Sequence, residues 1–305
     1  MKQNKKKILI TGCHGMLGGN ILRLLKKKNY NFIGTHKTKN YSKNINKELY
    51  LDLTKKKKIN IFIKKTNPNI IIHTVGLVNL GLCEKSYKLS KKHNITSLQN
   101  LISNLSKDTY FIFISSDQVY GKNKTATELD ENLKPLNVYG KHKLLCEKLV
   151  KDYFNKYIII RTNIFGLNYN NNNKGFAHWI LRHIKNRTIA TTFKNYFFHP
   201  INAYFLGKII FKLINMNFTG LINIGSKNKI SKHLFVKKFY KIFGVKNKTI
   251  NPINAPKIFF KIRNKTLNLN IKKMLKLRIK PPTIDQSIKL LKKQLNENKS
   301  LQKIL

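Results

Sequence analysis

The chain of 305 residues is long enough to bury a full hydrophobic core, in one large α/β unit or in two closely joined domains. No apolar run is long enough to span a bilayer, and the short apolar segment near the N-terminus ends in glycines, which argues against a signal peptide. Three widely spaced cysteines suit a reducing compartment and indicate neither a disulfide framework nor a metal site. We therefore expect a cytoplasmic protein without a bound metal.

Basic residues dominate the charge, since 61 Lys and Arg against 12 Asp and Glu give a formal net charge of +49. Such a charge suits a nucleic-acid or anionic-membrane partner, and an RNA-associated protein is one alternative. However, Lys, Asn and Ile are enriched along the whole chain, and no confined basic arm or stripe with interleaved aromatic residues stands out. The codons of these three residues are rich in A and T. We interpret the charge as compositional drift and expect no specific nucleic-acid partner and no membrane partner.

The N-terminal segment has the pattern of a strand, a glycine-rich turn and a helix. Residues 8–10 are apolar and predict a short buried strand, and a run with helical spacing begins at Asn20. Between them, Gly12, Gly15 and Gly18 have the spacing G-x-x-G-x-x-G. Glycine lets the backbone turn tightly and approach a pyrophosphate, and the free N–H groups of a helix's first turn point at it. The segment therefore predicts a dinucleotide-binding site.

The end of the second predicted strand, residues 31–36, bears on the choice of cofactor. An acidic residue there would bind the ribose hydroxyls of NAD, whereas basic or small residues accommodate the 2′-phosphate of NADP. The run from His36 and Lys37 to Lys39 contains no acid, which favours NADPH, with NADH as the alternative. Asp52, after the next short strand, either caps the following helix or lies beside the adenine.

Buried strands and helices then alternate along the chain. Continuous apolar runs predict strands over residues 70–76, 110–114 and 157–166, separated by helical segments. This alternation predicts an α/β fold, a Rossmann-type doubly wound parallel sheet with helices on both faces.

We expect residues 1–166 to form the NAD(P)-binding Rossmann domain. Residues 167–305 would form mainly a smaller C-terminal substrate-binding region, with segments near 200–225 returning to the Rossmann core. An asparagine-rich stretch, residues 168–174, predicts an exposed mobile loop between the two. Helices are expected over residues 176–185, 204–214, 232–243 and 284–295, with a strand over 220–225.

A second group of residues has the pattern of a catalytic site. Ser116 and Asp117 follow the strand at residues 110–114, where doubly wound sheets place their ligands. Tyr139 and Lys143 are four residues apart, so a helix brings them to one face. That pair alone also fits a solvated helix start, and its significance comes from the combination with Ser116 and the glycine turn.

Together these features resemble the extended short-chain dehydrogenase/reductase superfamily. The closer resemblance is to the dTDP-4-dehydrorhamnose reductase family of sugar-nucleotide reductases, and it covers nearly the whole chain. The stretches that carry it are His73–Asn79 with Cys83 and Glu84, Ser115–Gly121, Pro135–Lys143, Arg161–Gly166, His199–Ile201 and the tail around Arg263.

The resemblance implies a mechanism for three residues. Tyr139 would donate a proton to the carbonyl oxygen of a nucleotide-linked 4-keto sugar while NADPH delivers hydride to its carbon. The ammonium of Lys143 would stabilise the phenolate, since a free phenol titrates near pH 10. Ser116 would hydrogen-bond the same carbonyl oxygen.

The resemblance also implies the ligand-binding residues. The residues expected at the cofactor are Gly12, Gly15, Met16, Leu17, Gly18, His36, Lys37, Asp52, Leu53, Val75, Gly76, Leu77, Tyr139 and Lys143. Those expected at the substrate, besides Ser116, are Asp117, Asn163 and His199. Asn94 would either hold a structural water behind Tyr139 or be merely structural.

The sequence also departs from the family pattern. Gly81 stands where family members often have an acid, and Ile164 stands where they often have an indole. The stretch Ser115–Gly121 is also similar to epimerases and dehydratases that act on nucleotide sugars, which remain an alternative to a reductase. A non-catalytic cofactor-binding regulatory subunit and a homodimer also remain open.

Overall fold

A parallel β-sheet forms the centre of the protein. The computed structural model describes residues 6–27, 30–37, 47–122, 125–168, 175–245 and 250–297. Within these, the main sheet has eight strands in the order β10-β7-β5-β4-β1-β2-β3, with β11 also paired to β7, and every pairing is parallel. The strands are β1 (Ile8–Thr11), β2 (Phe32–His36), β3 (Glu48–Tyr50), β4 (Ile70–His73), β5 (Tyr110–Ile114), β7 (Tyr157–Phe165), β10 (Pro200–Asn202) and β11 (Gly220–Ile224).

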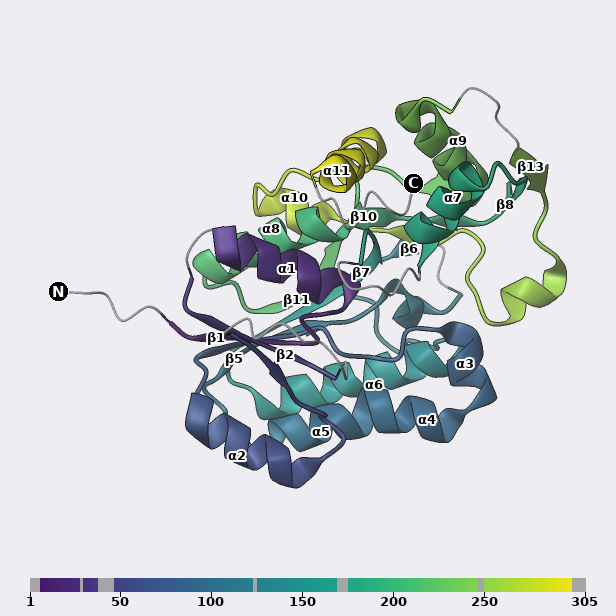
Figure 1. Cartoon of the computed structure of the whole chain (residues 1–305). Helices are drawn as coiled ribbons and strands as arrows, with labels where there is room; N and C mark the ends of the chain where they lie inside the picture. The colour runs from purple at the N-terminus through teal and green to yellow at the C-terminus, as the bar shows by residue number, and fades with distance from the viewer. Residues whose placement is uncertain are drawn as a thin grey trace.

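Helices cover both faces of this sheet, so the predicted doubly wound fold is confirmed (Figure 1). On one face lie α1 (Met16–Lys27) and α8 (Ala203–Asn215), and on the other lie α2 (Lys56–Thr66), α5 (Ser97–Ile102) and α6 (Val138–Tyr153). Alternate strand residues serve the two cores: Ile70 and Ile72 face the first pair of helices, and Ile71 faces the second set. The apolar runs are continuous because both faces of each strand are buried.

Strand β7 is shared between two partners on the same side. Its residues 158–162 pair with β11, and from Asn163 to Phe165 it pairs with β10. Strands β10 and β11 thus extend the same sheet as β7, although they follow it in the chain by about forty and sixty residues. At Asn163 the pairing partner of β7 changes from β11 to β10, and after Phe165 the chain leaves the sheet for the C-terminal part.

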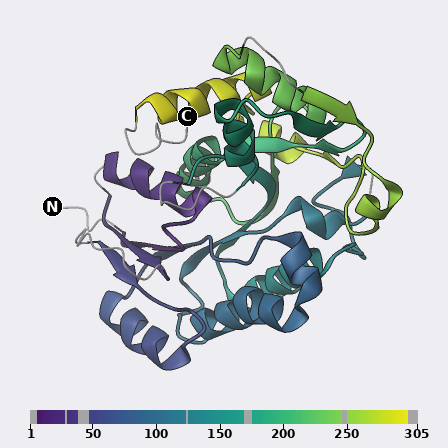
Figure 2. The same ribbon diagram turned by 45° about the vertical axis from the view of Figure 1, so that its right-hand side comes forward.

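The C-terminal part packs around a core of its own, seen at the top of Figure 2. Helices α7 (Phe176–Lys185), α9 (Lys232–Phe243) and α11 (Ile284–Asn296) enclose this core, and α10 (Lys272–Lys276) packs against the main core. Three small two-stranded sheets accompany them: β8 (Ala190–Phe193) with β13 (Ile250–Ile253), β9 (Phe197–Phe198) with β12 (Ile230–Ser231), and β6 (Thr125–Ala126) with β14 (Asn268–Leu269). No helix among the described residues is long and apolar enough to cross a membrane.

Two features differ from the sequence-based expectations. Helix α1 begins at Met16, four residues before the predicted start, because Gly18 and Gly19 belong to the helix and pack inward. The helix α3 (Leu80–Lys85) and the two-residue strands were not predicted, since such short segments have no measurable periodicity. The expected loop lies almost wholly outside the described residues, as do Thr38 and Lys39.

The glycine turn fits its helix so closely that one position tolerates no side chain. A Cβ placed on Gly18 would lie 2.1 Å from the carbonyl oxygen of Gly12, and Gly12 itself has a φ of +77°, which favours glycine. We expect Gly18→Ala to lower the free energy of unfolding by about 1–3 kcal/mol, as overpacking does.

Chemical denaturation measures this loss. Gly81→Ala is the matched control, because nothing but the side-chain oxygen of Asn79, at 3.5 Å, comes near the added Cβ among the described residues. Equal stabilities of the two variants would contradict the close fit.

Candidate active site

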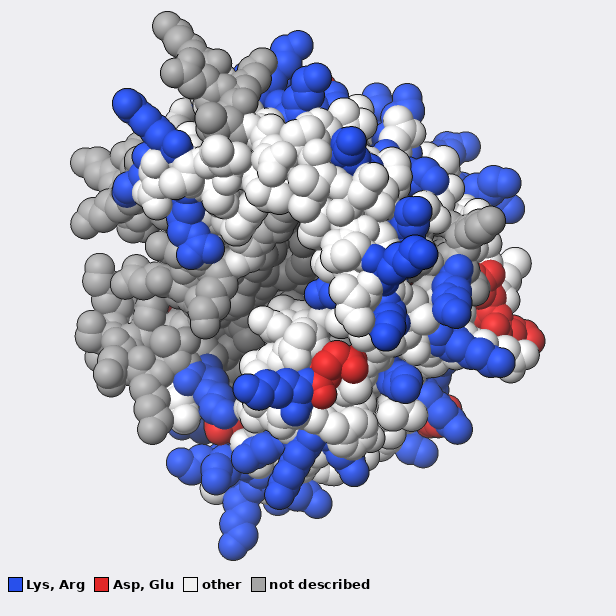
Figure 3. All heavy atoms as spheres, turned by 90° about the vertical axis from the view of Figure 1, so that its right-hand side faces the viewer, with Lys and Arg blue, Asp and Glu red and all other residues white. Residues whose placement is uncertain are grey.

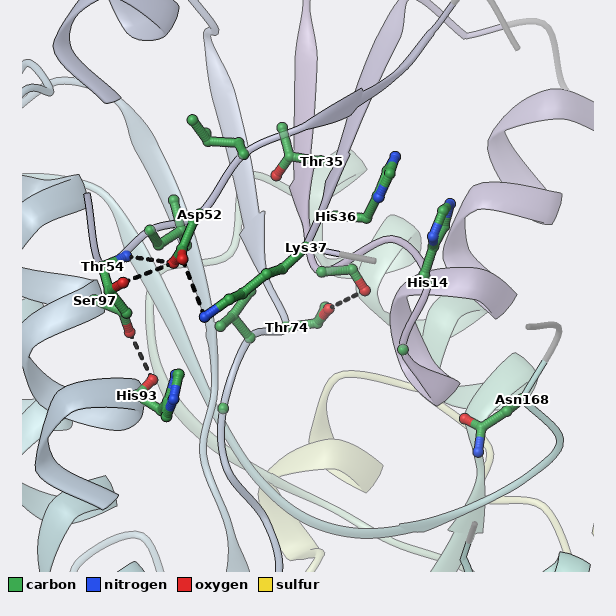
Figure 4. Close-up of a pocket in the computed structure, with 16 residues that line it drawn as sticks. His14, Thr35, His36, Lys37, Asp52, Thr54, Thr74, His93, Ser97 and Asn168 are labelled. Carbon is green, nitrogen blue, oxygen red and sulfur yellow. Dashed lines mark hydrogen bonds and ion pairs between the residues drawn. The ribbon is translucent and has the colours of Figure 1, made fainter. Parts of the chain in front are cut away.

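A cavity of about 370 Å³ opens at the carboxyl ends of β1, β2 and β4 (Figure 4). The glycine turn forms one wall with Gly12 and Gly15, and Val75 and Gly76 after β4 form another. The expected cofactor residues His36, Lys37, Asp52 and Leu53 also line it. The structure thus brings these predicted residues to one cavity, while Met16, Leu17 and Gly18 continue from its glycine wall into α1.

Asp52 anchors Lys37 at the edge of this cavity. The Nζ of Lys37 lies 3.0 Å from Oδ2 of Asp52, and Thr54 donates to Oδ1 from both its backbone N–H and its hydroxyl. Burial raises the pKa of the Asp52 carboxyl, but the hydrogen bonds from Thr54 and Lys37 outweigh it and hold the pKa below its usual value. Asp52 therefore both fixes the turn before α2 and lines the cavity.

A stacked pair of imidazoles lies opposite, as Figure 4 shows. The ring centroids of His14 and His36 are 3.9 Å apart, and Nε2 of His14 lies 3.0 Å from Oε2 of Glu48. The other oxygen of Glu48 pairs with Lys26 at 2.7 Å. The ligand atoms of Cys13, His14 and Glu48 all lie within 4.8 Å of one another. Burial and the charge of Glu48 raise the pKa of the Cys13 thiol to about 12, so the free thiol is protonated at neutral pH.

Ser116 and Tyr139 come from neighbouring turns held together by a glycine. Ser116 caps the short 3₁₀ helix Asp117–Tyr120, and the side chain of Asn137 caps α6 by accepting from the N–H of Gly140 at 2.7 Å. A Cβ on Gly140 would lie 2.5 Å from the carbonyl oxygen of Gln118. Only glycine lets α6 begin this close to the turn after Ser116.

The three expected catalytic side chains meet at this point. The hydroxyl of Ser116 is near enough to that of Tyr139 to oppose the rise in the pKa of the phenol, and Nζ of Lys143 lies 5.8 Å from the centre of the Tyr139 ring. Lys143 also donates to the carbonyl oxygen of Ile114, the last residue of β5, at 2.8 Å. A Cβ on Gly76 would lie 3.6 Å from the same Nζ. Because Gly76 lines the cavity, the ammonium of Lys143 adjoins it.

Burial shifts the pKa values of both Tyr139 and Lys143. It raises the pKa of the Tyr139 phenol, against the opposing effect of the hydrogen bond with Ser116, and it lowers the pKa of the Lys143 ammonium. The phenol is therefore protonated at neutral pH, the form that a proton donor requires.

Asn94 lies in a π-helical turn, Lys92–Thr96, and fixes the neighbouring backbone. Its Oδ1 accepts from the N–H of Leu77 at 2.8 Å, and its Nδ2 donates to the Leu77 carbonyl at 3.2 Å. These contacts give Asn94 a structural role, and they hold the expected cofactor residue Leu77 in place.

The expected substrate residues divide into two groups. Asn163 donates to Oδ2 of Asp117 at 2.7 Å, and Ser116 donates to Oδ1 at 3.2 Å, so these three lie together. Burial raises the pKa of the Asp117 carboxyl despite these hydrogen bonds. His199 is buried, and its Nε2 lies 2.6 Å from the carbonyl oxygen of Ser226. That contact joins the start of β10 to the loop after β11, and a role for His199 at the substrate stays a prediction.

Sequence reasoning missed a buried ion pair beneath the site. Arg161 on β7 donates to Glu147 on α6 through Nη2 at 2.7 Å and Nε at 3.0 Å, and the hydroxyl of Ser115 donates to Glu147 at 2.5 Å. Burial lowers the pKa of Arg161, but the bonds to Glu147 outweigh it and raise the pKa. The spacing of Tyr139, Lys143 and Glu147, four residues each, was the available signal, because it places all three on one helix face.

A glycine turn after the first strand of a doubly wound sheet, with a buried Ser, Tyr and Lys beside it, defines a protein of the extended short-chain dehydrogenase/reductase type. The family described as RmlD substrate binding domain matches residues 6–296. The chain belongs to this family, and the resemblance seen in its sequence is confirmed.

Individual relatives agree with this family. The chain is 28% identical over 163 residues to the dTDP-4-dehydrorhamnose reductase of Salmonella typhimurium, covering 52% of this chain and 53% of that protein. It is 27% identical over 146 residues to methionine adenosyltransferase 2 subunit beta of Xenopus tropicalis, covering 48% of this chain and 42% of that protein. The matches thus span about half the length of these relatives. A crystal structure of dTDP-4-dehydrorhamnose reductase from Bacillus anthracis in complex with NADP superimposes on this chain with a TM-score of 0.82. The superposition covers 95% of this chain and 99% of that one at 23% identity, so the two proteins have the same fold.

The buried ion pair leads to a prediction about stability. We expect Glu147→Gln to lower the free energy of unfolding by about 3–5 kcal/mol, because it leaves the charge of Arg161 buried without a counter-charge. Chemical denaturation tests this. Asp285→Asn is the matched control, because Asp285 pairs with Lys238 at 2.8 Å at the surface, where the loss should stay within about 1 kcal/mol. A similar small loss in both variants would contradict the prediction.

Proposed function

We propose that the chain is an NADPH-dependent reductase of a nucleotide-linked 4-keto sugar. The observation that carries the proposal is the meeting of Ser116, Tyr139 and Lys143 next to a cavity walled by the glycine turn. A solvated helix start would leave Tyr139 and Lys143 exposed, whereas both are buried.

The cavity fits a dinucleotide. The absence of side chains at Gly12, Gly15 and Gly76 leaves room for phosphate groups against the backbone, and the first turn of α1 turns its N–H groups toward them. Lys37 and His36 at the end of β2 supply positive charge and hydrogen-bond donors where a 2′-phosphate would lie. The relative from Bacillus anthracis binds NADP, which supports the same ligand for this chain.

The side chains then act on the carbonyl group of the sugar. When bound, NADPH would supply a hydride to the carbonyl carbon. Ser116 would orient the carbonyl oxygen by a hydrogen bond, and Tyr139 would give that oxygen its proton. Lys143, fixed by the Ile114 carbonyl, would stabilise the phenolate that remains. Asp117 and Asn163 would contact the sugar beside the reacting group.

The relatives support a sugar nucleotide as the substrate, and they also include a protein of each alternative kind. The relative from Xenopus tropicalis is a subunit of another enzyme, so a regulatory subunit would keep the cavity without turnover. An epimerase would regenerate its cofactor in each cycle, whereas a reductase consumes it. A cytoplasmic location and a homodimer remain predictions.

The deciding experiment is NADPH oxidation with a panel of nucleotide 4-keto sugars. A reductase oxidises one NADPH for each sugar reduced. Isomerised sugar without net oxidation would indicate an epimerase, and cofactor binding without any sugar chemistry would indicate a regulatory subunit.

The proton donor can be removed with little change of shape. We expect Tyr139→Phe to bind cofactor normally but to lose roughly a hundred- to ten-thousand-fold in kcat, because the ring stays and the proton is lost. Ser116→Ala should lose on the order of ten- to a thousand-fold, since one oriented hydrogen bond is missing. A near-normal rate for Tyr139→Phe would refute the proposed chemistry.

The choice of cofactor should depend on Lys37. We expect wild-type protein to prefer NADPH over NADH, and Lys37→Ala to reduce kcat/KM about tenfold for NADPH only, because one charge-assisted hydrogen bond to the 2′-phosphate is lost. Lys58→Ala removes an equal charge from α2 as a control. An equal loss with both cofactors would mean that Lys37 acts only through its pairing with Asp52.

A further inference from the structure

Lys232 is the first residue of α9, in the C-terminal part of the chain. Its ammonium lies among three aromatic rings. Its Nζ lies 3.4 Å from the ring centre of Phe198, 3.9 Å from that of Phe176 and 5.8 Å from that of Tyr196. The backbone N–H of Lys232 donates to the carbonyl oxygen of Tyr196 at 2.9 Å, which fixes the start of the helix against these rings. The position of the ammonium is therefore set by three separate segments of the chain.

This ammonium lacks the partner that a cation in such a place needs. The three rings attract it through their faces, and its three N–H groups meet no hydrogen-bond acceptor among the residues with described positions. A cation at the N-terminus of a helix also opposes the helix dipole. Burial lowers the pKa of Lys232 to about 7, and the charge of Asp117 opposes this shift. The folded protein therefore keeps an unfavourable cation here.

The groups that face Lys232 connect it to the active site. Asp117 follows Ser116 directly, and its carboxylate is close enough to interact with the Lys232 charge. Tyr196 also interacts with Asp117 and with Arg263, whose guanidinium lies 4.3 Å from the ring centre of Phe259. Lys232 thus lies in the neighbourhood of Asp117, next to the expected substrate residues.

A nucleotide-linked 4-keto sugar needs an anion-binding group on the side of the sugar ring opposite to its ketone. The sugar carries its ketone on C4 and its diphosphate on C1, which are opposite positions of the ring. With the ketone at Ser116 and Tyr139 and the ring beside Asp117, a diphosphate on the other side of the ring would come near the cations around Asp117, of which Lys232 is one. Figure 3 shows a cleft in one face of the molecule, with Lys and Arg spread around it and few Asp and Glu.

We propose that Lys232 binds the diphosphate of the nucleotide sugar through its unpaired ammonium, an assignment that rests on the proposed function. The diphosphate supplies hydrogen-bond acceptors for the ammonium, and its negative charge compensates this partly buried cation. The same contact would orient the sugar, because it holds the end opposite to the reacting carbonyl.

The test uses dTDP-glucose and UDP-glucose, which carry a hydroxyl instead of the ketone and so bind without reacting. Calorimetry with NADPH present, which cannot exchange hydride with an alcohol, compares wild-type protein with Lys232→Met and Lys232→Arg. We expect affinity to fall roughly ten- to a hundredfold in Lys232→Met and to be kept in Lys232→Arg. Lys208→Met is the matched control, because it removes an equal charge that also lies over a ring, 5.2 Å from that of Tyr204, on α8.

The pH dependence of wild-type protein gives a second measurement that needs no variant. The diphosphate of these probes does not titrate between pH 6.5 and 9, whereas the free ammonium loses its proton above pH 7 or so. Wild-type affinity should therefore fall over this range, and Lys232→Arg should hold its affinity. Equal affinity in wild type and Lys232→Met, or a flat wild-type profile, overturns the assignment alone. Failure of wild-type protein to bind either probe overturns the proposed function together with it.

Discussion

The ion pair between Glu147 and Arg161 is the constraint on which the candidate active site depends. It joins α6 to β7 within the core, and the bond from Ser115 brings the end of β5 to the same carboxylate. Because Glu147 shares its helix face with Tyr139 and Lys143, fixing one end of that face fixes the others. The expected catalytic side chains are therefore oriented by a charge pair that lies outside the lining of the cavity.

Charge compensation is arranged differently in the rest of the site. Glu48 neutralises Lys26 and lies against His14, and Asp52 neutralises Lys37, so the lysine that lines the cavity already has a partner. Lys143 is held by a carbonyl oxygen, and Lys232 lies among aromatic rings near the carboxylate of Asp117. In a chain with so few acidic residues, each carboxylate that is present near the site has a specific structural task. Most of the large net charge is thus a property of the surface, where the majority of the described lysines are exposed.

Much of the fold could be predicted because its strands are continuous runs of Ile, Leu and Phe between polar turns. Helices α7 and α9 have the predicted bounds, since their apolar residues recur with the helical period. The two-residue strands could not be predicted, because pairing in such segments depends on packing between distant parts of the chain. Tyr139 and Lys143 could be found from their spacing and their motif. Lys232 could not, because lysine is common everywhere in this sequence and only three remote rings distinguish this one.

The sharing of β7 between two partners has a consequence for how the chain can be divided. A chain ending at Gly166 would contain the glycine turn and all three catalytic candidates, yet β7 would be left as an open edge without β10 and β11. Helix α8 would also be missing, and with it the cover over α1 and over the side chains of Ile158 and Ile160. An uncovered apolar face beside an unpaired strand is prone to aggregation. The cofactor-binding part and the part after it are therefore separable in sequence but interdependent in folding.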